Sequence, residues 1–238
     1  MKRLRRFARR ALRRVRRGRS PSEYVATVDG LTVRFSIEGR YSRRWFLPRY
    51  RGGALHEAAL TMHLVRLCGP DACFIDVGAN LGWFACGVGR HLDGGEVHSF
   101  EMDDLSYALL RRNVALIGLD HVRCTLAAVG DREGHATYFR PPGVASPGAS
   151  VVQKREAFSE RVERDMITLD GYCAEHGVAP DVIKIDVEGA EMAVLQGMRD
   201  VLRRHRPVLQ AGNLCFGGRG LAACGRLHRP GRRRPSAG

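Results

Sequence analysis

The chain of 238 residues has little that would anchor it in a membrane or cross-link it covalently. No apolar run approaches the ~18 residues of a membrane span, and no apolar stretch follows the first arginines to form a signal peptide. The seven cysteines are odd in number and form no C-x-x-C pair, so neither a disulfide framework nor a zinc site is expected. We expect them to be small core residues of a cytoplasmic protein.

Acidic residues are absent from both ends of the chain, where the positive charge is concentrated. The formal net charge is +14; residues 1–20 supply 11 Lys or Arg and residues 211–238 supply six Arg. Subtracting these cations leaves a net charge of −3 for residues 21–210. A duplex-binding domain would carry a basic face on its folded body. Nucleic acid is therefore not expected as a partner.

Residues 1–20 have the pattern of a basic amphipathic helix. Apolar residues recur at helical spacing from Leu4 to Val15, and arginines cover the remaining surface. Such a helix can lie weakly on an anionic membrane surface, which would make the protein peripheral to the membrane. A solvated basic tail, an over-long choice of start codon and an organelle transit peptide are the alternatives.

Between residues 71 and 210, short apolar strands alternate with helical segments, a pattern typical of an α/β fold with a parallel sheet. Residues 122–129 and 135–139 are expected to form a hairpin around the turn at 130–134. The other expected strands are 73–77, 96–100 and 182–187, and the expected helices are 83–92, 104–116, 168–176 and 190–205.

Residues 21–70 precede this domain. They contain a β-hairpin at 24–37, in which Asp29-Gly30 favours a tight turn. A loop at 41–53 and a helix at 55–67 are expected to follow it.

The most informative segment is residues 74–82, Phe-Ile-Asp-Val-Gly-Ala-Asn-Leu-Gly. It reads as a buried strand and a turn into a helix, in which Gly78, Asn80 and Gly82 tolerate positive φ. The spacing differs from the Gly-x-Gly-x-x-Gly of dinucleotide-binding sites, which disfavours the alternative of a nicotinamide-dependent oxidoreductase. Asp76, just ahead of the turn, suits a cationic amino-acid group better than a phosphate. S-adenosylmethionine, which carries an ammonium, a sulfonium and no phosphate, fits that requirement.

A second acidic residue, Glu101, ends the strand run 97–100 and lies 25 residues past Asp76. An acidic residue at the end of the second strand of a doubly wound sheet can accept both hydroxyls of a ribose. A solvated carboxylate at a strand end is the alternative. Asp131, in the turn 130–134, could meet an adenine amino group, although a turn residue needs no function.

Residues 182–191, Val-Ile-Lys-Ile-Asp-Val-Glu-Gly-Ala-Glu, place charges in an apolar strand. Lys184 is costly there unless it is paired, so we expect it to neighbour Asp186, which it could orient. A strand lysine whose side chain extends to the end of the sheet is the alternative. Asp186 and Glu188 come at the carboxyl end of the strand, where open α/β sheets bind ligands. Asp186 is the first candidate for anchoring an amino-acid group or acting as general base, and Glu188 is the second. The histidines show no spacing that suggests a metal.

Together these segments resemble the FkbM family of S-adenosylmethionine-dependent methyltransferases. The order and intervals fit over roughly residues 50–209, and the segments that carry the resemblance are 74–82, 99–103, 128–134, 183–191 and 206–209. The resemblance implies a class I methyltransferase fold, a Rossmann-like doubly wound sheet. It also implies a hydroxyl acceptor on a small molecule, natural product or sugar. The cofactor contacts implied by it are Asp76, Gly78, Ala79, Asn80, Gly82 and Glu101.

The chain departs from the family pattern after Leu209. The family would continue with further strands, whereas residues 211–238 are rich in Gly, Arg and Pro and contain no acid. Such a composition weakens strands. A change of character where a strand is expected is typical of a frameshift, although a low-complexity tail is the alternative. We therefore expect incomplete C-terminal strands and a disordered tail at 211–238. An inactive or truncated methyltransferase-like protein is therefore an alternative. The Pro/Gly/Ser-rich loop at 140–150 is expected to border the acceptor.

Overall fold

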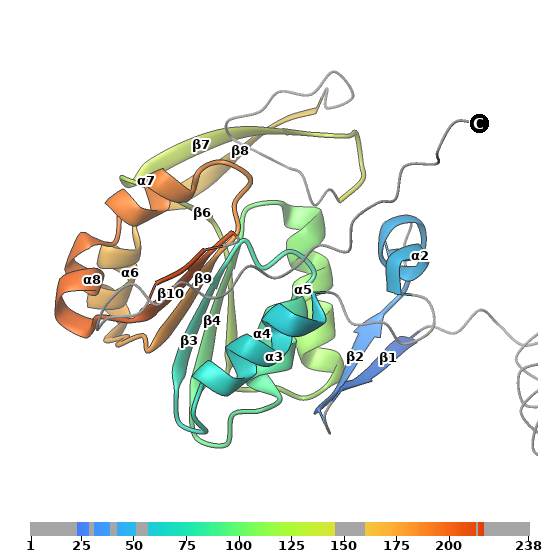
Figure 1. The fold of residues 1–238 in the computed structure, drawn as a ribbon. Helices are drawn as coiled ribbons and strands as arrows, with labels where there is room; N and C mark the ends of the chain where they lie inside the picture. Colours follow the sequence, from blue (N-terminus) through green and yellow to red (C-terminus); the bar gives the residue numbers. More distant parts are fainter. Residues whose placement is uncertain are drawn as a thin grey trace, which may run out of the picture.

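The computed structural model describes residues 23–28, 31–38, 42–50, 57–145, 160–212 and 214–216. Within these residues the centre of the molecule is a six-stranded sheet of order β11-β10-β9-β3-β4-β5 (Figure 1). All neighbours are parallel except the pair β10–β11. The strands are β3 (Cys73–Val77), β4 (Glu96–Glu101), β5 (Val122–Leu126), β9 (Val182–Ile185), β10 (Val208–Ala211) and β11 (Leu214–Phe216).

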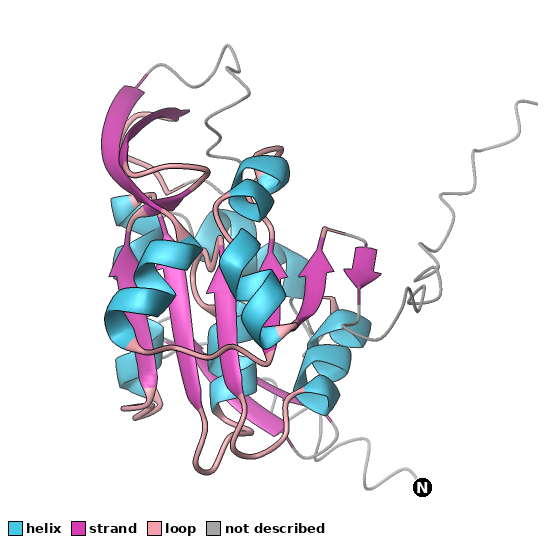
Figure 2. Cartoon of the chain, turned by 90° about the vertical axis from the view of Figure 1, so that its left-hand side faces the viewer, coloured by secondary structure: helices cyan, strands magenta, loops and turns pink. Residues whose placement is uncertain are grey.

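Helices cover both faces of this sheet (Figure 2). One layer contains α3 (Ala58–Leu67), α4 (Trp83–Gly89) and α5 (Asp104–Leu116), and the other contains α6 (Leu169–His176), α7 (Glu191–Gln196) and α8 (Arg199–His205). Successive strand residues therefore enter different cores: Phe74 packs in the first and Ile75 in the second. Burial on both faces explains why these strands are continuous apolar runs. The expected doubly wound α/β sheet is confirmed.

The strand order reverses between β3 and β9, because β4 and β5 extend the sheet on one side and β10 and β11 on the other. Open α/β sheets bind ligands beyond the carboxyl ends of the strands at such a reversal. The ends of β3, β4 and β9 thus mark the place for a site.

The N-terminal hairpin is present as β1 (Glu23–Val28) and β2 (Leu31–Ser36), an antiparallel pair. The expected loop at 41–53 is wrong for residues 42–50, which form η2 (Ser42–Phe46) and α2 (Leu47–Tyr50). Aromatic packing supplies the reason: the ring of Phe46 lies 4.7 Å from that of Tyr50 and 5.8 Å from that of Trp83. Tertiary contacts that local sequence does not reveal order this segment.

The hairpin expected at 122–139 is also wrong. β5 pairs with β4 in the central sheet, and β7 (Gly134–Arg140) pairs with β8 (Glu160–Ile167). A short β6 (Ala128–Val129) joins β8 in parallel, completing a separate sheet that lies above the carboxyl ends of the central strands (Figures 1 and 2). Charged residues fill much of β8, which hid its strand pattern in the sequence. We call β7 and β8 the ribbon.

The long helix expected at 190–205 is two helices, α7 and α8, separated at Gly197. A Cβ at Gly197 would lie 1.9 Å from the carbonyl oxygen of Gly130, so the chain breaks where it meets the turn after β6. The close approach of two backbones requires glycine there.

The sheet does not end at residue 210 as expected, because β11 pairs with β10 through Leu209–Phe216 and Ala211–Leu214. The expectation of a disordered tail from residue 211 is therefore wrong for this segment, because one more strand follows Gly212. The remainder of 211–238, and the whole of segment 1–20, lie outside the described residues. Among the described residues, none of the helices has the length and hydropathy of a membrane span.

Candidate active site

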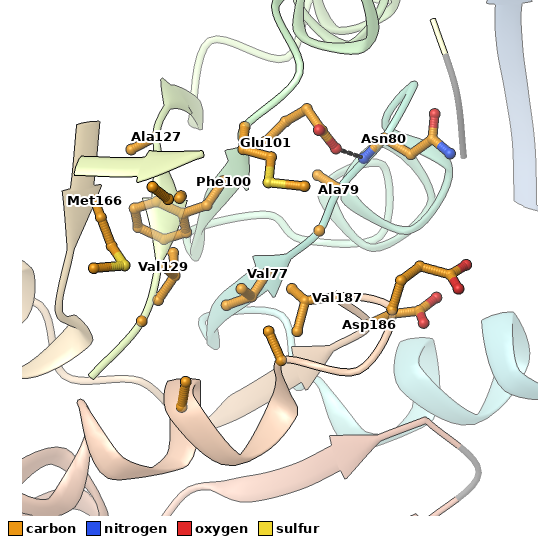
Figure 3. A pocket seen from close by; sticks show the side chains of 18 of the residues that line it. Val77, Ala79, Asn80, Phe100, Glu101, Ala127, Val129, Met166, Asp186 and Val187 are labelled. Carbon is orange, nitrogen blue, oxygen red and sulfur yellow. Dashed lines mark hydrogen bonds between the residues drawn. The ribbon is translucent and has the colours of Figure 1, made fainter. Parts of the chain in front are cut away.

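A cavity of about 430 Å³ opens at the carboxyl ends of β3, β4 and β9 (Figure 3). This volume lies in the range of small-molecule and cofactor sites. It is bordered by the turn after β3, the end of β4, the segment from Ala127 to Arg132, the ribbon and the residues that follow β9. The fold thus brings three sequence motifs, about 110 residues apart from first to last, to one site.

The turn after β3 has the backbone that its sequence predicts. Gly78, Asn80 and Gly82 have φ values of 76°, 52° and 91°. A Cβ at Gly78 would lie 2.0 Å from the carbonyl oxygen of Asp186, so the ends of β3 and β9 touch at this glycine. The amides of Gly78 and Ala79 donate to the carbonyl of Phe100 at 3.0 and 2.9 Å. The turn is therefore fastened to both neighbouring strands.

Glu101 lies in the cavity wall with both carboxylate oxygens held in place. Oε2 accepts from the amide of Asn80 at 2.7 Å and Oε1 from the amide of Asp103 at 2.8 Å (Figure 3). Each carboxylate oxygen can accept a second hydrogen bond, which matches the two hydroxyls of a ribose. Burial raises the pKa of Glu101 to about 7, although the two amides oppose the shift.

Lys184 pairs with Asp76, not with Asp186 as the sequence suggested. Nζ lies 2.9 Å from Oδ1 of Asp76 and also donates to the carbonyl of Gly78 at 3.2 Å. The reason is register: Asp76 and Lys184 are directly paired residues of β3 and β9, whereas Asp186 lies beyond the strand end. Burial lowers the pKa of Lys184, but the charges of Asp76 and Asp186 outweigh it and raise the pKa, so the side chain is an ammonium.

This pairing changes the expected role of Asp76. Its side chain is fully buried, and Asp76 does not line the cavity, whereas Lys184 does. Asp76 therefore lies behind Lys184, and a direct contact of its carboxylate with a ligand stays a prediction. The carboxylate compensates a buried cation.

Asp186 and Glu188 both line the cavity and are exposed. The amide of Asp186 donates to the carbonyl of Val77 at 3.0 Å, which holds the chain at the end of β3, and Glu188 has a φ of 52°. In Figure 3, Glu101 and Asp186 lie on either side of Ala79. One side of the cavity thus offers a ribose acceptor and the other offers two carboxylates for a cation or a proton.

Another part of the cavity wall is apolar. Phe100, Ala127, Val129 and Met166 lie around one side of it (Figure 3), which suits a flat aromatic base. Asp131 also lines the cavity, where its carboxylate pairs with Arg132 at 3.0 Å. Of the predicted cofactor residues, Gly78, Ala79, Asn80, Glu101 and Asp131 line the cavity, whereas Asp76 and Gly82 do not.

The model of the methyltransferase FkbM domain family matches residues 76–217, more than half of the chain. The chain belongs to the FkbM methyltransferase family. The resemblance seen in the sequence is confirmed, and this is a family of S-adenosylmethionine-dependent methyltransferases. Nothing in the match supports the alternative of a nicotinamide-dependent oxidoreductase.

Two curated relatives are methyltransferases. The chain is 27% identical over 151 residues to the 2-O-methyltransferase NoeI of Sinorhizobium fredii, covering 58% of this chain and 61% of NoeI. It is 25% identical over 187 residues to the hexuronic acid methyltransferase AglP of Haloferax volcanii, covering 76% of this chain and 71% of AglP. The chain thus spans under two thirds of the length of NoeI. A solved structure of methyltransferase FkbM from Methylobacillus flagellatus is 20% identical, with a TM-score of 0.43, and covers 60% of this chain and 33% of that chain.

Several residues that line the site of this FkbM-family chain were missed in the sequence. Met166 comes from β8, which was not expected, and Phe46 and Tyr50 come from the segment expected to be a loop. In residues 160–167 only Val162, Met166 and Ile167 are apolar, so no alternation of apolar and polar residues marked β8. The aromatic spacing of 46 and 50 fits one helical turn.

Toward the amino ends of β3 and β4, the side chains of Cys73, Glu96 and His98 bring three potential metal ligands within 4.8 Å of one another. The spacing of the histidines and cysteines along the chain had indicated no metal site. His98 contacts Tyr172 through Nδ1 at 2.8 Å and Glu96 through Nε2 at 3.2 Å. Burial raises the pKa of the Cys73 thiol to about 12, which disfavours the thiolate that a metal requires.

Proposed function

We propose that this chain transfers a methyl group from S-adenosylmethionine to a hydroxyl of a sugar-type acceptor. The observation that carries the proposal is the charge pattern of the cavity. Glu101 can accept from a ribose, the apolar wall fits an adenine, and Asp186 and Glu188 oppose positive charge. S-adenosylmethionine carries all three of these groups, and when bound it supplies a methyl group on a sulfonium.

Lys184 is the group we assign to the methionine carboxylate. Among the described residues its Nζ donates to Asp76 and Gly78, which leaves one of the three ammonium hydrogens for an anionic ligand. Asp76 acts through Lys184 by fixing its position and charge. This arrangement replaces the direct contact that we first expected from Asp76.

Asp186 is the proposed general base, with Glu188 as the second candidate. Either carboxylate can accept the proton of an acceptor hydroxyl as its oxygen attacks, and such a base contributes about 10²–10⁴-fold to a rate. Both are exposed at the cavity, where an acceptor hydroxyl can reach them. Holding donor and acceptor together supplies most of the remaining catalysis.

The acceptor side is assigned to the aromatic wall formed by Phe46, Tyr50 and Trp83. These rings line the cavity, and the rings of Tyr50 and Trp83 stack at 5.6 Å. Aromatic side chains pack against the apolar face of a sugar ring while leaving its hydroxyls free. The relatives support this class, since AglP is a hexuronic acid methyltransferase and NoeI a 2-O-methyltransferase.

Cofactor binding and turnover test the proposal separately. Calorimetric titration of the purified chain with S-adenosylhomocysteine should show saturable binding that Glu101→Gln weakens. Methyl transfer should then be measured on a hexuronic acid and on the matching neutral hexose. Binding without transfer to either sugar would favour the alternative of an inactive methyltransferase-like protein, and no binding at all would refute the proposal.

We also propose that the protein is cytoplasmic and contacts the membrane surface weakly. Free cysteines at positions 68, 73, 86, 124 and 173 support a reducing, cytoplasmic setting. The basic segment 1–20 supports weak contact with an anionic membrane surface. Sedimentation of the chain with anionic and with neutral vesicles at two salt concentrations tests this contact, because an electrostatic one weakens with salt.

A further inference from the structure

A buried arginine, Arg140, joins the ribbon to the turn that carries Glu101. Its side chain is 8% exposed, and its Nη1 donates to Asp103 and to Asp104, both at 2.6 Å. Nε and Nη2 form a fork with the carboxylate of Glu160 at 3.1 and 2.9 Å. Two-pronged pairs of this kind fix geometry as well as charge. Arg140 does not line the cavity, so any effect on a ligand passes through its partners.

Other residues on the same face of the ribbon contact the same turn. The hydroxyl of Tyr138 donates to Oδ1 of Asp103 at 3.2 Å, and Nε of Arg164 donates to the carbonyl of Met102 at 2.9 Å. Alternate residues of a strand share a face, and the side chain of Arg161, on the outer face, is 62% exposed. The inner face of the ribbon is therefore directed at the turn between β4 and α5.

Asp103 connects this contact to Glu101. Its amide donates to Oε1 of Glu101 at 2.8 Å, and its carboxylate caps α5 by accepting from the amide of Ser106 at 3.0 Å. The side chain of Asp103 is fully buried. A buried carboxylate requires compensation by charge and hydrogen bonds, which Arg140 and Tyr138 supply.

We propose that Arg140 is a positioning residue for cofactor binding, which holds and neutralises Asp103 so that the turn presents Glu101 to the ribose. The inference rests on the proposed function, since it assigns the ribose contact to Glu101. Two charged groups bear on that carboxylate, Asp103 on its own turn and Lys184 from β9, and Arg140 in turn pairs with Asp103. Burial is the main cause of the raised pKa of Glu101, and the charge of Asp103 adds to it.

The test is the pH profile of S-adenosylhomocysteine binding, measured by calorimetry from pH 5.5 to 8.5. In Arg140→Met the uncompensated charge of Asp103 should move the midpoint upward by about one pH unit, the usual effect of a nearby like charge. Binding would then be roughly threefold weaker at pH 7.5 and close to tenfold weaker at pH 6. Arg161→Met, which removes an exposed arginine from the outer face of the ribbon, should leave the profile unchanged.

Two further variants separate charge from folding. Arg140→Lys keeps the cation but loses the fork, so its midpoint should stay near that of the wild type while affinity falls at every pH. Tyr138→Phe removes only the hydroxyl that donates to Asp103 and should move the midpoint upward by less than Arg140→Met does. It serves as the deciding variant if Arg140→Met does not fold.

An unchanged midpoint in folded Arg140→Met, or in Tyr138→Phe if the former is unfolded, would overturn the inference and leave the proposed function standing. The proposed function fails in a different way. If the wild type does not bind S-adenosylhomocysteine, or if Glu101→Gln binds it as the wild type does at every pH, the ribose contact itself is wrong.

Discussion

Lys184 and Asp76 face each other across neighbouring parallel strands, with 2.9 Å between Nζ and Oδ1. Their side chains are 3% and 0% exposed, so the pair is removed from solvent at the centre of the sheet. The ammonium also lies 4.9 Å from the centre of the Phe84 ring. The cation of this buried ion pair thus lines the cavity, whereas its anion does not.

The first prediction concerns this buried pair. Asp76→Asn should lower the free energy of unfolding by about 3–5 kcal/mol, because it leaves a buried ammonium without its counter-charge. The double variant Asp76→Asn/Lys184→Met should lose less than the sum of the two single variants, with a coupling of about 0.5–3 kcal/mol. Urea denaturation measures all four proteins.

The control for that prediction is Glu163→Gln, which breaks the exposed pair of Glu163 with Arg161. It should change the free energy of unfolding by less than about 1 kcal/mol, as exposed pairs do. If the losses of unfolding free energy caused by the two single variants at positions 76 and 184 add up to the loss in the double variant, the two charges do not stabilise each other.

The second prediction is that cofactor affinity falls below neutral pH. A ribose hydroxyl donates to an ionised Glu101, whose pKa is raised to about 7 in the free protein. S-adenosylhomocysteine should therefore bind about tenfold more weakly for each pH unit below 7. In Glu101→Gln the affinity should be lower and nearly independent of pH. A flat profile in the wild type would contradict the prediction.

The third prediction follows from the same pKa and concerns the stability of the cofactor-free protein. The pKa of Glu101 is higher in the folded state than its ordinary value of 4.5, so the folded state binds the proton more tightly. This contribution favours folding at pH below about 4.5 and is lost as the pH rises toward 7. Denaturation of the wild type and of Glu101→Gln at pH 5 and at pH 8 isolates this contribution. Between pH 5 and pH 8, the free energy of unfolding should fall more in the wild type than in the variant.

The fourth prediction uses two glycines with positive φ. Gly78→Ala should abolish cofactor binding and destabilise the fold, because the new Cβ would lie 2.0 Å from the carbonyl oxygen of Asp186. Gly118→Ala has the same kind of backbone, with a φ of 64°, but open space around the Cβ. It should cost only the strain of the left-handed conformation, about 1–2 kcal/mol. Equal losses in melting temperature would mean that the contact between the ends of β3 and β9 is unimportant.

The fifth prediction addresses the acceptor side. Tyr50→Leu should raise the KM for a sugar acceptor and leave the affinity for S-adenosylhomocysteine within about twofold, the scatter expected for a site with no shared contact. Tyr50→Phe keeps the ring and should behave as the wild type. A parallel loss of cofactor affinity in Tyr50→Leu would place the aromatic wall on the cofactor side instead.

The sequence alone determined the α/β class, the strands that form the sheet centre and the turn at Gly78, Asn80 and Gly82. These depend on local chemistry: apolar runs bury as parallel strands, and only glycine and asparagine readily adopt positive φ. Glu101 could be predicted as a site residue for a similar reason, since it follows a strand whose end the sequence marks. Lys184 could be recognised as needing a partner, but its partner could not be named.

The tertiary structure decided which distant residues meet. The register between β3 and β9 pairs Lys184 with Asp76, which is 108 residues away in the sequence. Proximity in the sequence had suggested Asp186 as the partner. The pairing of β7 with β8 brought Arg140 onto Asp103, and it displaced the hairpin that the local pattern favoured. Contacts between segments far apart leave no periodic pattern in the chain, because they arise from burial and charge compensation only after the strands have packed. In this methyltransferase-family chain, the conformation of the turn after β3 therefore depends on neighbouring residues, whereas the ion pairs at the site depend on residues far apart in the sequence.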